Sequence, residues 1–390
     1  MQIDSDLVAM IITNVGWACF IIAGVGSIYT LAAAILVRRF FRHEIADPQE
    51  FPPVSILKPL HGDEFGLAKN LEALCLLDYP GPFQIVFGVQ DPYDPAIQHV
   101  ENLRRAFPHI DICLVVDVRE HGANRKVSNL INLMREVRHD LLVLADSDIG
   151  IDRAYLRQIV AELVKPEIGL VTCLYRGRPT TGLWPRLSAM AIEYSFMPSV
   201  VLGLSIGLAR PCFGSTMVLR RAVLQEIGGF EAFADHLADD NAIGEAVRHR
   251  GYKVSIPPMA VTHLCSEQSL RELLIHEMRW ARTIRAIAGR GFAGTIITHP
   301  FPFALLGAAA MGLSVPTAGA VAAVLGCRLI LGRLVDEALG GKTAGWWLMP
   351  VRDMLSFAVF CASFFVGSVT WRGRRFHVRA DGMLLPVEEH

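Results

Sequence analysis

The stretch Leu141 to Asp148, LLVLADSD, joins a short apolar run to two acidic residues that follow it directly. Similar β-rich runs occur at intervals of 27 to 31 residues and begin at Val54 (VSILK), Phe83 (FQIVFGV), Ile110 (IDICLVV) and Ile168 (IGLVTCL). Amphipathic stretches such as 125–139 fill the gaps, with apolar residues recurring on one helical face. Strand–helix repeats of this length predict a domain of α/β class over 52–295, with a mostly parallel sheet covered by helices on both faces.

Composition limits the kind of protein that this chain can be. It has 390 residues and 19% charged residues, with a mean hydropathy of +0.37. That is too apolar for an ordinary soluble enzyme and too charged for a multi-span transporter. The net charge of −1 provides no basic field, so no nucleic-acid partner is expected. The eight cysteines include no CxxC pair, which predicts small core hydrophobes in a reducing compartment and neither a zinc site nor a disulfide framework.

An apolar segment precedes the predicted sheet. Residues 7–37 are almost free of charge, and a basic cluster follows at 38–43. This length exceeds the apolar core of a signal peptide and suffices to span a bilayer. The segment is therefore expected to be an N-terminal transmembrane anchor, and the basic cluster places the following domain in the cytoplasm. A cleaved signal peptide is the alternative, but the segment lacks a small-residue cleavage pattern.

A second apolar region, 301–371, is expected to be a C-terminal transmembrane region, followed by a basic tail at 372–390. Within it, 301–331 contains Pro316 and forms either one kinked span or a hairpin of two short spans. A further span is expected at 354–371. Three spans in total are favoured, because they place the basic tail in the cytoplasm, whereas a hairpin makes the number even.

Acidic residues follow two of the predicted strands. Asp146 and Asp148 alternate on an extended segment, so both carboxylates can face one ligand, and such hard oxygen ligands suit Mg²⁺ or Mn²⁺ bound to substrate phosphates. A polar turn or helix cap is the alternative. Asp91 ends FGVQD and is expected either to contact a nucleoside or to form a turn with Pro92. Ligands bind beyond the carboxyl ends of parallel strands, so Asp91 and Asp146 are predicted to converge on one crevice.

The chain has neither GxGxxG after the first strand nor a P-loop, so phosphate must be bound by a metal or by basic side chains. Lys126 lies between the third strand and its helix, where the helix N-terminus favours anions. Lys126 or Arg125 could contact a diphosphate, and a solvated lysine is the alternative. Asp239 and Asp240 open another helix, where they either cap it or provide the general base that deprotonates an attacking hydroxyl.

The segment HEMRW places His276, Arg279 and Trp280 at i, i+3 and i+4 of a helix predicted over 269–288, on one face. An arginine there can chelate phosphate oxygens, and the tryptophan can form the floor of a sugar pocket. Interfacial anchoring at a membrane boundary is the alternative.

The segment RPCFGST, 210–216, precedes a strand. Its apolar lead-in, 198–208, is too short to span a bilayer but fits an interfacial position, so the segment is expected to border the entry of a lipid. The residues assigned to this acceptor region are Cys212, Phe213, Gly214 and Asp239. An ordinary buried loop is the alternative.

Together, Asp91, Asp146, Asp240 and the HxxRW segment resemble the membrane-bound glycosyltransferases of GT-A fold, most closely the ceramide glucosyltransferase family, glycosyltransferase family 21. The resemblance covers nearly the whole chain. It implies an inverting, divalent-metal-dependent transfer from a UDP-sugar, with Asp240 as base and with His276, Arg279 and Trp280 in the catalytic set. It also implies a metal on Asp146 and Asp148, and UDP-sugar contacts from Lys58, Asp91, Lys126 and Asp146.

Longer strings, among them VSILKPLHGDE, HGANRKVSNLINL and HEMRWARTIRA, look like the bacterial members associated with hopanoid biosynthesis. That resemblance implies transfer of N-acetylglucosamine from its UDP donor to a hopanoid polyol at the inner leaflet of the bacterial cytoplasmic membrane. Ceramide glucosylation from UDP-glucose is the alternative. Asn241 stands where the family usually has an aromatic residue, which leaves the acceptor side open. A non-catalytic scaffold of the same fold is an alternative of another class, but none of the four signals is damaged.

Overall fold

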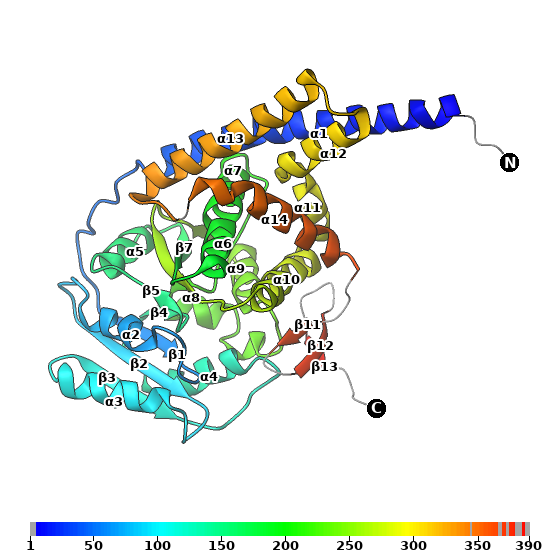
Figure 1. The fold of residues 1–390 in the computed structure, drawn as a ribbon. Coiled ribbons are helices and arrows are strands. Elements are labelled where there is room, and N and C mark those ends of the chain that lie inside the picture. Colours follow the sequence, from blue (N-terminus) through cyan, green and yellow to red (C-terminus); the bar gives the residue numbers. More distant parts are fainter. Residues whose placement is uncertain (1–4, 344, 366–368, 372–373, 379–383, 387–390) are drawn as a thin grey trace. The chain divides into compact units, whose positions relative to one another are not determined.

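The structure is a computed structural model that describes residues 5–343, 345–365, 369–371, 374–378 and 384–386. The chain forms two compact units (Figure 1). The sheet unit comprises His43–Arg178, Arg210–Ser266 and Gly373–His390, and the helical unit comprises Met1–Arg42, Pro179–Ala209 and Glu267–Arg372. The helix that carries HxxRW therefore belongs to the helical unit, whereas the sequence placed it within 52–295.

The sheet unit is built on a seven-stranded sheet of order β3-β2-β1-β4-β8-β6-β9. Its strands are β1 (Val54–Pro59), β2 (Phe83–Val89), β3 (Asp111–Val116), β4 (Leu141–Ala145), β6 (Ile168–Thr172), β8 (Thr216–Arg220) and β9 (Lys253–Ser255). Strand β1 runs parallel to β2 and β4, and β2 runs parallel to β3. Strand β8 is antiparallel to β4 and to β6. The mostly parallel α/β sheet predicted from the repeat is thus confirmed.

Helices cover both faces of this sheet because its strands bury alternate residues in opposite directions. Ile56 belongs to one apolar core and the adjacent Leu57 to the other. The first core includes α2 (Leu67–Cys75), α3 (Ala96–Ala106) and α5 (Tyr155–Leu163). The second includes α4 (Arg125–Leu133), α8 (Arg221–Glu226), α9 (Asp239–His249) and the short helix η3 (Glu231–Phe233). A further short helix, η1 (Met134–Glu136), follows α4.

A three-stranded sheet lies next to the end of β4. Its order is β5-β10-β7, formed by β5 (Ile149–Gly150), β10 (Ala260–Cys265) and β7 (Leu174–Pro179). Strand β5 pairs antiparallel with β10, with His263 opposite Ile149. The sheet unit also contains β12 (Arg374–Val378), which pairs antiparallel with β13 (Leu384–Pro386) in the predicted basic tail.

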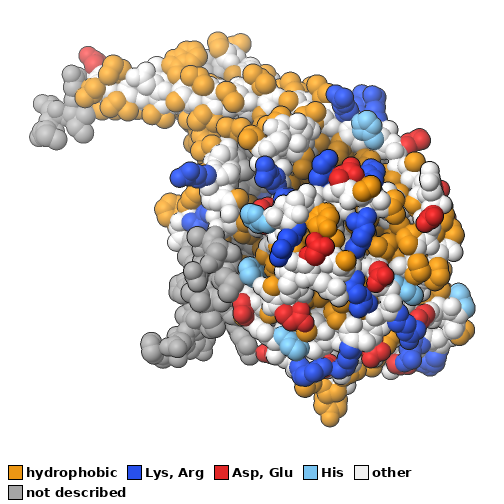
Figure 2. All heavy atoms as spheres, turned by 180° about the vertical axis from the view of Figure 1, so that it is seen from behind, with side chains coloured by type: hydrophobic (Ala, Val, Ile, Leu, Met, Phe, Trp, Pro, Cys, Tyr) orange, Lys and Arg blue, Asp and Glu red, His pale blue; other side chains and the backbone are white. Residues whose placement is uncertain are grey.

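The helical unit consists mainly of helices, several of them apolar. They are α1 (Ser5–Phe40), α6 (Leu183–Ala191), the π-helix η2 (Ile192–Phe196), α7 (Met197–Ser205), α10 (Leu270–Ile287), α11 (Gly289–Gly294), η4 (Thr295–Thr298), α12 (Pro300–Met311), α13 (Val315–Leu339), η5 (Trp346–Leu348) and α14 (Met349–Ser363), with β11 (Val369–Trp371) after them. Helix α1 packs against α7, α12 and α13. Hydrophobic side chains cover the surface of α1 in Figure 2, and Ile28 is 71% exposed.

Three described helical stretches are long and apolar enough to cross a membrane, namely 6–40, 183–205 and 315–339. A fourth is added if 289–298 and 300–311, which meet at a bend of 62°, form one span. The stretch 301–331 is two helices that separate after Met311, and Pro316 lies in the first turn of α13, where proline is tolerated. The expected span 354–371 overlaps α14, which ends at Ser363, and positions 366–368 of that span lie outside the described residues. No span was expected at 183–205.

Candidate active site

The acidic segment after β4 is held in place by a buried lysine. Lys58, on β1, is 1% exposed, and its Nζ donates to the main-chain carbonyl of Asp146 over 2.5 Å. Burial lowers the pKa of Lys58 to about 8, while the negative charges of Asp148 and Asp146 oppose that shift. The sequence assigned Lys58 to the UDP-sugar. In the structure its ammonium group anchors the turn that carries both strand-end carboxylates.

The second carboxylate of this turn is paired with a histidine from the small sheet. Asp148 Oδ2 lies 3.3 Å from His263 Nδ1, and the adjacent Ser147 hydroxyl donates to Glu64. Burial by itself raises the pKa of Asp148, but the hydrogen bond and charge of His263 and the charge of Lys58 outweigh burial and lower that pKa to about 2. Asp148 is therefore an anion at any physiological pH. Nothing in the sequence pointed to His263, which reaches Asp148 only because β5 and β10 pair.

Lys126 lies inside the acidic cluster. Its side chain is 17% exposed, and its Nζ lies 2.6 Å from Asp146 Oδ1 and 3.7 Å from Asp239 Oδ2. The desolvation that burial causes favours the neutral amine, yet these carboxylates raise the pKa of Lys126 well above its ordinary value. The alternative of a solvated lysine is thus wrong. A permanent positive charge lies between the end of β4 and the start of α9.

The first turn of α4 positions this lysine. Asn124 is the N-cap, and its side-chain oxygen accepts from the main-chain N–H groups of Lys126 and Val127, which satisfies two donors that the helix leaves unpaired. The amide nitrogen of Asn124 donates to the carbonyl of His236 over 2.8 Å and to Asp239 Oδ1 over 3.3 Å. One buried asparagine therefore ties the start of α4 to the segment that opens α9.

Asp240 has the environment of a base that works near neutral pH. Its Oδ2 accepts from Gly214 N over 2.8 Å, and its Oδ1 accepts from Asn241 N over 2.7 Å. Desolvation and then the charge of Asp239 raise the pKa of Asp240 to about 6. The N-cap residue of α9 is Ala238, so both acids lie in the first turn of the helix, where Asp240 accepts from one of its N–H groups. Each carboxylate oxygen of Asp240 retains a lone pair with which it can accept a proton.

Gly214 marks the point where the charged groups converge. A Cβ atom at this position would lie 3.1 Å from Lys126 Nζ, 3.4 Å from Asp146 Oδ2 and 3.4 Å from Asp240 Oδ2. The adjacent Phe213 is fixed by its main chain, whose N–H donates to Thr172 Oγ1 over 2.9 Å. The segment assigned to the acceptor region, including the buried Cys212, is thus brought beside the predicted base.

Asp91 occupies the same edge of the sheet at a distance. It follows β2, and its Oδ1 accepts from Tyr93 N over 2.9 Å, so the side chain shapes a turn. In the sheet order, β1 separates β2 from β4. Two strand spacings amount to about 10 Å, so Asp91 and Asp146 lie at the same edge of the sheet without being adjacent.

The strand-end carboxylates fit a divalent cation that is shared with a substrate. In the described part of the chain, no three His, Cys, Asp or Glu side chains form a metal-binding group. Asp146 and Asp148 can provide two hard oxygen ligands without a third protein side chain. A Mg²⁺ or Mn²⁺ ion would complete its shell with phosphate oxygens and water, which is how Mg²⁺ is commonly held by proteins.

In the helical unit, the HxxRW residues lie on α10. His276 Nδ1 lies 2.7 Å from Glu267 Oε1, which also accepts from the Ser188 hydroxyl over 2.9 Å. The rings of His276 and Trp280 meet edge to face with centroids 4.6 Å apart, as their i, i+4 spacing predicts. Buried Glu267 therefore fixes the ring orientation of His276.

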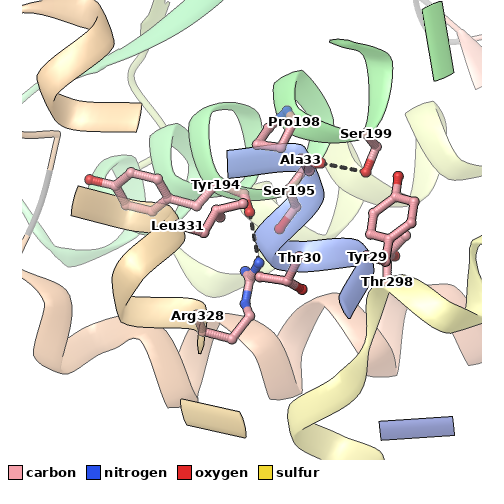
Figure 3. A pocket seen from close by; sticks show the side chains of 10 residues that line it. All are labelled: Tyr29, Thr30, Ala33, Tyr194, Ser195, Pro198, Ser199, Thr298, Arg328 and Leu331. Carbon is pink, nitrogen blue, oxygen red and sulfur yellow. Dashed lines mark hydrogen bonds between the residues drawn. The ribbon is translucent and has the colours of Figure 1, made fainter. Parts of the chain in front are cut away.

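A small cavity lies within the helical unit between α1, the π-helix with α7, and α13 (Figure 3). Its lining consists of Tyr29, Thr30, Ala33, Tyr194, Ser195, Pro198, Ser199, Thr298, Arg328 and Leu331. Arg328 Nη1 donates to the carbonyl of Tyr194 over 3.0 Å in its wall. The cavity volume of about 10 Å³ suits roughly one water molecule, so it holds no sugar or lipid headgroup.

Comparisons with known proteins identify related glycosyltransferases. The family model described as Glycosyl transferase family 21 matches residues 18–384. Ceramide glucosyltransferase 3 of Caenorhabditis elegans is 23% identical over 357 residues, which cover 88% of this chain and 76% of that protein. Ceramide glucosyltransferase 1 of the same organism is 26% identical over 215 residues, covering 55% of this chain and 46% of that protein.

Two further proteins are similar. Beta-monoglucosyldiacylglycerol synthase of Synechocystis sp. is 24% identical over 219 residues, covering 54% of this chain and 43% of that protein. The solved structure of mannosyltransferase PcManGT from Pyrobaculum calidifontis, in complex with GDP-Man and Mn²⁺, matches with a TM-score of 0.56 and 18% identity, over 90% of this chain and 99% of that one. The latter likeness shows the fold, which is that of the GT-A glycosyltransferases.

Proposed function

Since this chain belongs to glycosyl transferase family 21, we propose that it transfers N-acetylglucosamine from UDP-GlcNAc to a hydroxyl of a hopanoid polyol, with inversion at the sugar carbon. The expected N-terminal anchor (7–37), catalytic domain (52–295), membrane region (301–371) and basic tail (372–390) belong to this proposal. So does its place at the inner leaflet of a bacterial cytoplasmic membrane. Helices long enough to cross a membrane support the membrane part of this location.

One observation carries the proposal. Lys126, Asp146 and Asp240 place charged atoms within 3.4 Å of a single point beside Gly214, at the carboxyl end of β4. A base with a pKa of about 6, a fixed cation and a strand-end pair of carboxylates are what transfer from a charged donor to a hydroxyl requires.

The proposed reaction is a single displacement. Asp240 accepts the proton of the acceptor hydroxyl while that oxygen forms a bond to C1 of the sugar. The bond from C1 to the diphosphate oxygen breaks on the opposite face, and UDP leaves with the bonding electrons. Arg279, proposed to bind the leaving diphosphate, would neutralise its developing charge, and Trp280 would contact the sugar.

The residues fit a divalent cation on Asp146 and Asp148. When bound, Mg²⁺ or Mn²⁺ would supply charge stabilisation to the leaving diphosphate. The mannosyltransferase structure has the same fold and contains Mn²⁺ together with GDP-Man, which supports a divalent metal here without deciding between the two ions. The protein's own contribution is to position both carboxylates: His263 pairs with Asp148, Lys126 pairs with Asp146, and Lys58 holds the turn between them from behind.

The acceptor is proposed to be a lipid because similar proteins carry the names of ceramide and diacylglycerol glucosyltransferases. Those names favour a second candidate, transfer of glucose from UDP-glucose to ceramide. The strings VSILKPLHGDE and HEMRWARTIRA favour the hopanoid reaction. The non-catalytic scaffold is disfavoured, because the base, both strand-end carboxylates and the HxxRW residues are all present.

Purified protein in detergent, incubated with each donor and each lipid and analysed by product mass, tests the proposal. We expect a mass gain of one N-acetylhexosamine on the hopanoid polyol with UDP-GlcNAc. A hexose on ceramide with UDP-glucose would instead establish the second candidate. No product from any donor–lipid pair, with the protein folded and the cation present, would refute both.

A further inference from the structure

Helix α10 has little apolar anchoring for its length. It runs from Leu270 to Ile287, and among these eighteen described residues Leu273 alone is buried. The helix packs against α6 and α14 of the same unit. Because an apolar stripe normally fixes how a helix is rotated about its axis, polar contacts have a larger share in fixing the rotation of α10.

The strongest of these contacts is a buried ion pair within the HxxRW motif itself. Glu277, whose side chain is 13% exposed, accepts from both terminal nitrogens of Arg352 on α14, over 2.5 and 2.8 Å. The Arg352 side chain is 0% exposed. Its Nη1 also donates to the Leu187 carbonyl of α6 over 3.2 Å, and its Nε donates to Ser356 over 3.1 Å. One guanidinium group therefore joins α10, α6 and α14.

Helix geometry relates this contact to the proposed catalytic residues. At about 100° per residue, Glu277 and Arg279 point about 160° apart around α10. Holding Glu277 against α14 therefore directs Arg279 away from α14. The Glu267 carboxylate fixes His276 by a second polar contact, and the ring of His276 packs on Trp280.

We propose that Arg352 is a positioning residue for the transfer reaction: through its bidentate bond to Glu277 it sets the rotation of α10 and thereby the direction of Arg279. This inference rests on the proposed function, in which Arg279 binds the leaving diphosphate. A buried ion pair is weak evidence for stability, because an apolar pair of similar volume is often equally stable. We infer that the role of the Glu277–Arg352 pair is to fix the orientation of α10, which two apolar side chains would not do.

The test replaces both members of the pair, Glu277→Leu with Arg352→Met, so that no buried charge is left alone and the protein folds. We expect kcat to fall about 10- to 100-fold, the cost of misplacing a catalytic group by a small distance, with the donor KM within about twofold of the original. Arg352→Lys, with Glu277 intact, keeps the positive charge but loses the bidentate geometry of the guanidinium group. Its kcat should therefore lie between those of the wild type and the doubly substituted protein.

A double-mutant cycle separates positioning from general loosening. In an Arg279→Ala background the paired substitution should lower kcat no further, because its effect acts through the missing arginine. The matched control is Arg328→Met with Asp353→Leu, another buried bidentate pair of the helical unit, which joins α13 to α14.

Additive losses in the Arg279→Ala background, or an equal loss in the control pair, would overturn the inference while leaving the proposed function intact. Unchanged kcat in the folded Glu277→Leu/Arg352→Met protein would do the same. A wild-type protein that transfers no sugar would overturn the proposed function, and this inference with it.

Discussion

Asp239 raises the pKa of its neighbour Asp240, and this influence can be measured. Because the pKa of Asp240 is about 6 rather than its ordinary 3.8, a base at this position is about nine-tenths ionised at pH 7 and about one-tenth ionised at pH 5. Below pH 6, kcat/KM should therefore fall about tenfold per pH unit. Asp239→Asn removes the repelling charge, keeps the shape and keeps an acceptor for Asn124.

In the plot of kcat/KM against pH, the acidic limb of the Asp239→Asn variant should move down by on the order of one pH unit, toward pH 5. It should not move further, because burial still raises the pKa of Asp240 after the charge of Asp239 is gone. At pH 5 the variant would then retain about half of its plateau rate, against about one-tenth for the wild type. The measurement is kcat/KM from pH 4.5 to 8 at saturating cation. Asp235→Asn, which removes an exposed charge that accepts from Ala123 N, is the matched control and should leave the limb in place.

A limb that stays at pH 6 or moves upward in Asp239→Asn would refute the electrostatic reasoning. If Asp239→Asn abolishes turnover while Asp240→Asn stays active, the roles of the two acids are reversed.

Three further outcomes are expected. Asp240→Asn should lower kcat by about 10²- to 10⁴-fold with binding of the UDP-sugar little changed, because only the proton transfer is lost. Steady-state kinetics and titration with the donor check this. A variant with weaker binding of the UDP-sugar but an unchanged kcat would contradict it. Asp148→Asn, or EDTA on the wild type, should nearly abolish turnover of a folded protein, and full activity in EDTA would rule out the metal role. Arg328→Met alone should destabilise the helical unit by about 3–5 kcal/mol, since it leaves the buried Asp353 carboxylate without its bidentate partner, so unfolding in detergent should begin at markedly lower temperature.

The fold was predictable because its signals are local. Each strand of the parallel part is a short apolar run bounded by polar residues, and the helices between them bury one periodic face. The strand-end position of Asp146 followed from the same pattern, since a residue after a parallel strand lies at the ligand-binding edge. The presence of Asp240 near Lys126 and Gly214 was implied only by the family resemblance, because no local pattern relates three loops.

Other features depend on contacts that the sequence does not display. His263 lies 115 residues after Asp148 and meets it through a two-residue strand that no periodicity reveals. In the sequence, Lys58 looks like an ordinary charged residue near a strand end. Only the structure shows that its amine is buried against the acidic turn. The apolar stretch 183–205 was missed as a possible span because it contains Arg186 and Glu193, and the structure buries the Glu193 side chain completely.

The π-helix between α6 and α7 has a consequence for how the chain is made. Its Tyr194 carbonyl accepts from Arg328, a residue translated 134 positions later. That arginine in turn needs Asp353, a further 25 positions along the chain. If α13 enters the bilayer as it leaves the ribosome, an arginine within it costs about 2.5–3.5 kcal/mol on insertion scales.

Biosynthesis therefore passes through a stage at which α13 has been synthesised but its charge has no carboxylate partner. The earlier π-helix, through its Tyr194 carbonyl, offers the first acceptor during this interval. We expect chains that end before Asp353 to insert α13 inefficiently and to be degraded. Chains that extend through α14 should insert α13 stably. Stable insertion of α13 would then depend on synthesis of α14, which carries the carboxylate partner of Arg328.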